Sequence, residues 1–136
     1  MREILFRGKT FDNRWVEGLL VWIDHNDETA LIREIGKAGV SYFDFLVEFE
    51  TVGQYTGLTD KNGKKIFEGD IIKATDSVPE YNLMVVRNED FGCFNDYYFG
   101  GEKHYTEQIR NADWYLRYKI IGNIHDNPEL LGGDKK

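Results

Sequence analysis

Carboxylates in two turn-rich stretches are the residues of this chain whose types could do chemistry. Glu68 and Asp70 flank a glycine in the middle of the chain, and Asp126 and Glu129 lie close together near its end. Two carboxylates can perform acid/base catalysis when the fold brings both into one cleft and raises one pKa. In turns, however, carboxylates commonly cap backbone amides. We therefore favour a structural role and keep a small carboxylate-dependent enzyme as the weaker alternative.

Metal and cofactor motifs are not indicated. Asp60, Gly63 and Glu68 follow one another as in part of a calcium loop, but the glycine comes too early and the loop is too short. His25 and the other histidines, at 104 and 125, lack the spacing of metal ligands. The chain also has no G-x-S-x-G turn and no glycine loop for a phosphate. We expect no catalytic residue, no metal and no cofactor.

Tyrosine is the side chain in excess, with eight in 136 residues. Tyrosine and tryptophan are enriched in protein interfaces, because they bury a large area at low entropic cost and keep a polar tip. The alternative is that they pack in the core. The candidates for an interface cluster in the second half of the chain: Tyr97, Tyr98, Trp114, Tyr115 and Tyr118.

Charge disfavours nucleic acid as a partner. The formal net charge is -7, and binding to a polyanion depends on Lys and Arg that neutralise phosphates. Lys61, Lys64, Lys65 and Lys73 lie close together, but Asp and Glu residues are interleaved with them. A neutral, solvated surface is therefore the better interpretation.

Size and composition predict one folded domain in a reducing compartment. Hydrophobic residues make up 41% of the chain and charged residues 30%, which is typical of globular proteins. The single cysteine, Cys93, cannot form a disulfide within the chain. No apolar run is long enough to cross a membrane as a helix, and no signal peptide follows Met1.

Turn residues position the central carboxylates. Asp60-Lys61-Asn62-Gly63 predicts a hairpin turn, with Asp accepting backbone amides and Gly at positive φ. Glu68-Gly69-Asp70 predicts a second tight turn, and we expect Gly69 as well as Gly63 in a conformation unfavourable for other residues.

The remaining pattern is that of short strands. In 40–50 the odd-numbered residues, among them Phe43 and Phe45, form the more apolar face and should point inward. The spacing of apolar residues in 106–117 allows either a short helix or a strand. Asn127-Pro128 predicts one helical turn. Strands are expected over 4–7, 15–23 with a bend or bulge at Gly18, 29–35, 40–50, 64–74, 83–86, 92–99 and 115–124.

Three segments in this order resemble the YopX-like proteins of phages and prophages: the opening Arg2 to Arg7, the central Gln54 to Lys73 and the closing Ile120 to Leu130. The resembling proteins usually carry an aromatic residue, often Tyr, at the position of His125, so this chain departs from the pattern with a more polar ring. The resemblance implies a phage or prophage context, and hence the cytoplasm of a bacterial host, but no chemistry. The motif residues, which we expect to be structural, are Tyr55, Gly57, Leu58, Asp60, Gly63, Ile66, Phe67, Glu68, Gly69, Asp70, Gly122, Asn123, Asn127 and Pro128.

Together these observations predict an all-β fold of short antiparallel strands. We expect a single domain over 1–131, in which strands of about 1–53 pack on a small SH3-like barrel of about 54–131 with a short helical turn near its end, and a disordered tail over 132–136. The expected function is that of a non-enzymatic accessory protein acting by protein contact, as a homo-oligomer or with an unidentified phage or host protein. The alternative is a single-stranded nucleic-acid binder in which Tyr55 and Phe67 stack on bases.

Overall fold

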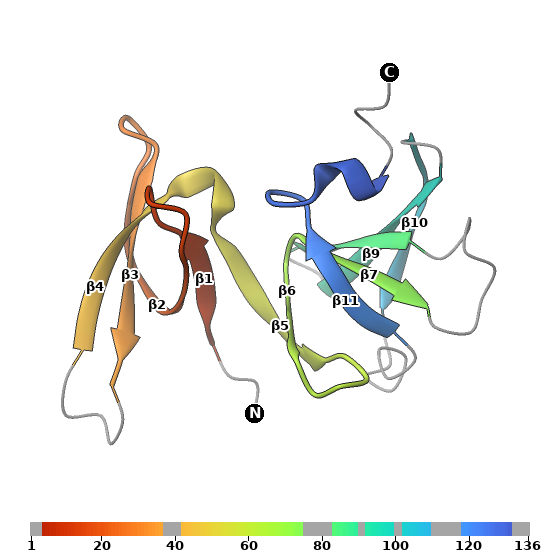
Figure 1. Ribbon diagram of the computed structural model, residues 1–136, viewed down its shortest axis with the longest axis horizontal. Coiled ribbons are helices and arrows are strands. Elements are labelled where there is room, and N and C mark those ends of the chain that lie inside the picture. The colour runs from red at the N-terminus through yellow and green to blue at the C-terminus, as the bar shows by residue number, and fades with distance from the viewer. Residues whose placement is uncertain are drawn as a thin grey trace. The chain divides into compact units, whose positions relative to one another are not determined.

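The computed structural model describes residues 4–36, 42–74, 83–89, 92–99, 102–109 and 118–131. These residues form antiparallel strands with two short 3-10 helices, so the all-β prediction is confirmed. The chain divides into two compact units, Met1–Tyr55 and Thr56–Lys136 (Figure 1). The tail over 132–136 and most of the segment expected as a short helix, 110–117, lie outside the described residues.

The first unit is a strongly curved antiparallel sheet. Its strands follow the order β4-β3-β2-β1-β5. An isolated bridge between Thr10 and Val47 also connects β4 to the residues that follow β1. The elements are β1 (Phe6–Lys9), β2 (Trp15–Asp24), β3 (Thr29–Ile35), β4 (Tyr42–Glu48), the 3-10 helix η2 (Phe49–Thr51) and β5 (Gly53–Thr59).

Alternation along β3 and β4 builds the core of this unit. Ala30 and Ile32 are fully buried, and Val47 joins them from β4 and Val16 from β2. This alternation confirms the inward face predicted for the odd-numbered residues near Val47. Phe43 is an exception, because it lies at the start of β4 and is 63% exposed.

The bulge in β2 lies at Val21 and not at Gly18, where we expected it. The register with β3 shifts between Leu20 and Trp22. Gly18 instead has a packing role, because a Cβ there would lie 2.0 Å from the carbonyl oxygen of Arg33. The glycine therefore allows β2 and β3 to approach closely, and the extra residue at position 21 re-aims the side chains that follow it.

The second unit begins within β5, at Thr56, and β6 (Lys65–Phe67) pairs with β5 as the last strand of the first sheet's order. Its five-stranded sheet has the order β10-β9-β8-β7-β11, with β7 (Asp70–Ala74), β8 (Leu83–Glu89), β9 (Gly92–Phe99), β10 (Glu102–Ile109) and β11 (Tyr118–Asn123), and the 3-10 helix η5 (Pro128–Leu131) follows. The core contains Ile66, Ile72, Met84 and Val86.

Neither sheet closes on itself in the described part of the chain, because β4 and β6 stand at opposite ends of one order and β10 and β11 at opposite ends of the other. The SH3-like barrel is therefore not confirmed. The segment 106–109 is the end of a strand, β10, and not the start of a helix. The helical turn at Pro128 is confirmed as η5. No helix in the described ranges is long and apolar enough to cross a membrane.

Candidate functional site

The carboxylate of Asp60 accepts hydrogen bonds from three backbone amides. Its Oδ1 accepts the amides of Asn62 at 2.8 Å and Lys64 at 3.0 Å, and its Oδ2 accepts the amide of Ile120 at 3.1 Å. Burial raises the pKa of this carboxyl group, but the three backbone donors and the charge of Lys64 together outweigh burial, so the net pKa is lowered. Asp60 is thus an anion that fixes the β5–β6 turn and ties it to β11.

Asp70 closes the second turn in the same way. It is 1% exposed, and its Oδ2 accepts the amide of Phe67 at 2.7 Å. The amide of Gly69 donates to the carbonyl of Val86 at 2.8 Å, and the carbonyl of Gly69 accepts the amide of Ile124 at 2.9 Å. The turn therefore connects β6 and β7 to β8 and to the residues after β11.

The predicted backbone conformations of the central glycines are confirmed. The φ angles are 82° at Gly63 and 93° at Gly69, and Gly57 of the same motif has a φ of 89°. In this region of φ a side chain is strained. The positive φ angles therefore explain the glycines at positions 57, 63 and 69 of the motif.

The closing segment forms a compact turn of its own. The Oδ1 of Asn123 accepts the amides of His125 and Asp126, each at 2.9 Å, and the Oδ1 of Asn127 accepts the amide of Asn123 at 3.2 Å. A Cβ at Gly122 would lie 2.5 Å from the Oδ1 of Asn127. These residues hold β11 and η5 together.

The apolar residues of the motif belong to the interior. Tyr55 is 7% exposed, Ile66 is 0% and Phe67 is 2%, while Leu58 packs against the second core. Within the described ranges, no group of three or more His, Cys, Asp or Glu side chains lies close enough to hold a metal ion.

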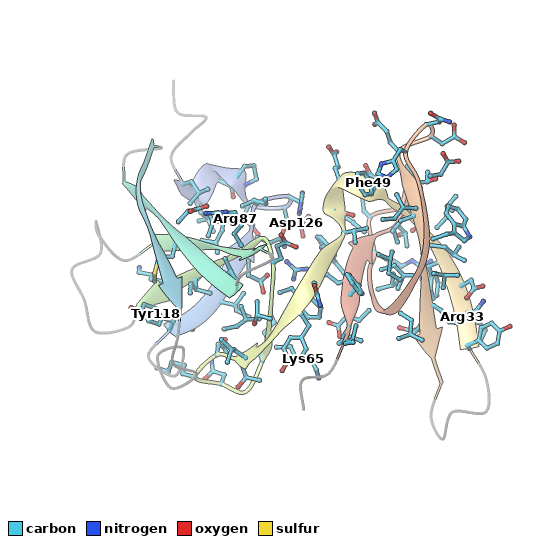
Figure 2. The ribbon with its side chains drawn as sticks, turned by 180° about the vertical axis from the view of Figure 1, so that it is seen from behind. Arg33, Phe49, Lys65, Arg87, Tyr118 and Asp126 are labelled. Atoms are coloured by element: carbon cyan, nitrogen blue, oxygen red, sulfur yellow. The ribbon has the colours of Figure 1, made fainter. Side chains whose placement is uncertain are left out.

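The tyrosines expected at an interface are placed only in part. Tyr118 is half-buried and packs against the second core, and Figure 2 shows it in that unit. Tyr97 and Tyr98 lie on β9, paired with Met84 and Leu83 of β8. Trp114 and Tyr115 lie outside the described residues.

The sequence interpretation missed an exposed apolar area on β2, β3 and β4. Trp22, Leu31 and Leu46 lie side by side in the register of β2, β3 and β4, and Trp22 and Leu46 are 43% and 46% exposed. Leu19 and Tyr42 extend this surface, at 46% and 55% exposed. We call it the outer face, defined by Leu19, Trp22, Leu31, Arg33, Tyr42, Asp44 and Leu46.

The comparisons with known proteins identify the family. The sequence profile described as YopX protein matches residues 5–132. The chain belongs to the YopX family. It is similar in structure to protein EF1440 from Enterococcus faecalis, with a TM-score of 0.55, 21% sequence identity and coverage of 96% of this chain and 99% of that one. That likeness shows the fold alone. No curated protein matches the chain.

In this YopX protein the outer face contains an ion pair between Arg33 and Asp44. Arg33 donates from Nε to Asp44 at 2.8 Å and from Nη2 at 3.0 Å, and its guanidinium lies 4.2 Å from the ring centroid of Tyr42. Figure 2 shows Arg33 on this part of the sheet. The hydrogen bonds from Arg33 lower the pKa of Asp44, so the pair stays ionised. The outer face therefore combines exposed apolar side chains with charges that compensate each other.

Proposed function

We propose that this YopX protein is a non-enzymatic accessory protein of a phage or prophage that acts by protein contact and associates with a second copy of itself through β4. The observation that carries the proposal is the exposure of β4, where Tyr42, Phe43 and Leu46 are 55%, 63% and 46% exposed. Its place of action would be the cytoplasm of the bacterial host.

The open backbone edge of β4 supports pairing with a second copy of the chain. β4 is the last strand of its sheet, and among the described residues its outer edge has one bridge, from Thr10 to Val47. An open edge presents unpaired amide and carbonyl groups, which are a template for another strand. Antiparallel pairing of β4 with β4 of a second copy satisfies both edges at once, because a two-fold interface uses the same surface twice.

The charge of the surface permits this contact in an acidic protein. The chain carries a formal net charge of -7, which opposes self-association in general. On the outer face, however, Arg33 and Asp44 are within 2.8 Å and neutralise each other. Pairing through β4 places the two outer faces side by side in one sheet, and the Arg33–Asp44 pair adds no net charge next to that edge.

The other two hypotheses gain less support. Nucleic-acid binding required Tyr55 and Phe67 to stack on bases, but these rings are 7% and 2% exposed. Enzyme chemistry at the Glu68-Asp70 turn required a free carboxylate, whereas Asp70 is buried and accepts the amide of Phe67.

Light scattering coupled to size-exclusion chromatography tests the proposal. We expect the wild-type protein to be larger than the 15.9 kDa of one chain at micromolar concentration. Leu46→Lys combined with Phe43→Lys should give a folded monomer, because it places charges on the edge strand. Ile124→Lys in the second unit, at a position 37% exposed, is the matched control and should leave the assembly intact. A wild-type monomer across a hundredfold concentration range would refute self-association.

A further inference from the structure

Two adjacent hollows lie at the tip of the β2–β3 hairpin in the first unit. The acidic hollow has a volume of about 370 Å³ and is lined by Phe11, His25, Asp27, Glu28, Glu48, Phe49 and Glu50. The apolar hollow has a volume of about 490 Å³ and is lined by Trp22, Ile23, Asp24, His25 and Asn26. His25 lines both, so a single bound segment can occupy the two together.

Hydrogen bonds from backbone amides hold the walls of the acidic hollow. The Oδ1 of Asp24 accepts the amides of Asn26 at 3.0 Å and Asp27 at 3.3 Å, which shapes the hairpin tip. The amide of Phe49 donates to the carbonyl of Glu28 at 3.0 Å and joins the tip to η2. The two sides of the hollow are therefore fixed relative to each other before anything binds, which lowers the entropic cost of binding.

The lining selects a cation. Four acidic residues, Asp27, Glu28, Glu48 and Glu50, line it, and neither Lys nor Arg does. The rings of His25 and Phe49 meet edge to face, with centroids 5.1 Å apart. Aromatic rings beside carboxylates favour an ammonium or guanidinium group, which pairs with the anions and packs against the ring.

The apolar hollow, named for its wall of Trp22 and Ile23, can accommodate a neighbouring apolar side chain. Trp22 is 43% exposed and Ile23 is 38% exposed at its wall. An isolated cation would leave both uncovered. A peptide segment that carries a basic side chain next to an apolar one matches both hollows in charge and in polarity.

We propose that the two hollows are a docking site for a basic, partly apolar segment of another protein, with a Lys or Arg side chain in the acidic hollow and an apolar side chain against Trp22 and Ile23. This site rests on the proposed role in protein contact, and it uses the hairpin tip and not the open edge of β4. A second copy of this chain fits poorly as the occupant, because its formal net charge of -7 opposes approach to four carboxylates.

Titration with two synthetic peptides tests the site. The probe is acetyl-Arg-Leu-Arg-Leu-amide, and the control is acetyl-Glu-Leu-Glu-Leu-amide. In ¹⁵N–¹H NMR spectra of the wild-type chain, the basic peptide should shift the amides of 22–28 and 48–50. A rise in salt concentration should weaken the binding of the basic peptide, since partly exposed ion pairs are screened. Shifts spread over the whole chain, or equal shifts with the acidic peptide, would overturn the proposal.

A charge-matched pair of variants separates the site from general attraction. The triple variant Asp27→Asn, Glu48→Gln, Glu50→Gln should lower the affinity for the basic peptide at least about tenfold. The control triple removes three exposed carboxylates elsewhere and should change the affinity less than about twofold: Glu17→Gln, Glu34→Gln and Glu129→Gln.

Equal weakening by both triple variants would overturn the docking site in favour of unspecific attraction. Loss of self-association in the hollow variant would assign the hollows to a second copy instead and would also overturn the proposal. Failure of the peptide to bind, while light scattering still reports a dimer that depends on Leu46, would refute the docking site and leave the proposed self-association standing.

Discussion

Asp60→Asn should destabilise the second unit by about 2 kcal/mol. The carboxylate receives three backbone amides, two on Oδ1 from Asn62 and Lys64 and one on Oδ2 from Ile120. Asn keeps the first two contacts but sets its own NH₂ group against the amide of Ile120. Losing one charge-assisted hydrogen bond and leaving one partly buried donor unsatisfied costs about 1–3 kcal/mol. Asp60→Ala, which removes all three contacts, should cost about 4 kcal/mol.

The pH dependence distinguishes this cause from a packing defect. The pKa of Asp60 in the folded protein is lowered from its ordinary value of 3.8, so the carboxylate adds stability that is fully present above that value. As the pH falls below 3.8 towards the folded pKa, Asp60 becomes protonated and its contribution is lost. The difference in stability between wild type and Asp60→Asn should therefore be constant from pH 7 to pH 5 and shrink below pH 4.

Urea unfolding followed by far-UV circular dichroism measures both effects. The midpoint should fall with an unchanged slope, as expected when stability changes but the exposed area does not. Asp27→Asn is the matched control, because Asp27 is exposed on the hairpin tip, and it should stay within about 0.5 kcal/mol of wild type. An Asp60→Asn variant as stable as this control at pH 7, or a stability difference independent of pH, would refute the reasoning.

Three further substitutions or assays test single features. Gly63→Val should cost about 1 kcal/mol or more in urea unfolding, because φ is 82° there, while Gly63→Asn should cost less since Asn tolerates that region. Gly18→Ala should cost about 2 kcal/mol, because the added Cβ would lie 2.0 Å from the Arg33 carbonyl oxygen; wild-type stability would contradict that contact. Single- or double-stranded DNA should not bind measurably near physiological salt in fluorescence anisotropy, whereas micromolar binding lost on changing Lys64 and Lys65 to Glu would overturn this expectation.

Local sequence signals predicted the turns and most of the strands. Asp60 and Gly63 define a turn through contacts within a few residues, so the hydrogen bonds to Asn62 and Lys64 could be predicted from residue types. The third contact, from the amide of Ile120, could not be predicted in this way, because it joins residues far apart in the sequence. The same limit applies to the expected barrel, since closure depends on pairing between distant strands.

The outer face escaped prediction for a different reason. The register shift between Leu20 and Trp22 adds one residue to β2, and a shift of one residue turns every later side chain to the opposite face. Trp22 is therefore exposed beside Leu46, although the run around it suggests a buried strand. The tyrosine excess predicted an interface in the second half of the chain, where the described Tyr118 packs against the core.

Hydrogen exchange of the β4 backbone, measured by NMR at two protein concentrations, tests the proposed self-association most directly. The edge pairing predicts that amides within 42–46 exchange more slowly as the concentration rises a hundredfold, because a second strand covers the open edge. Amides of β7, which pairs with β8 and β11 within the same unit, provide the reference and should not change. Exchange within 42–46 that is fast and independent of concentration would contradict pairing through β4.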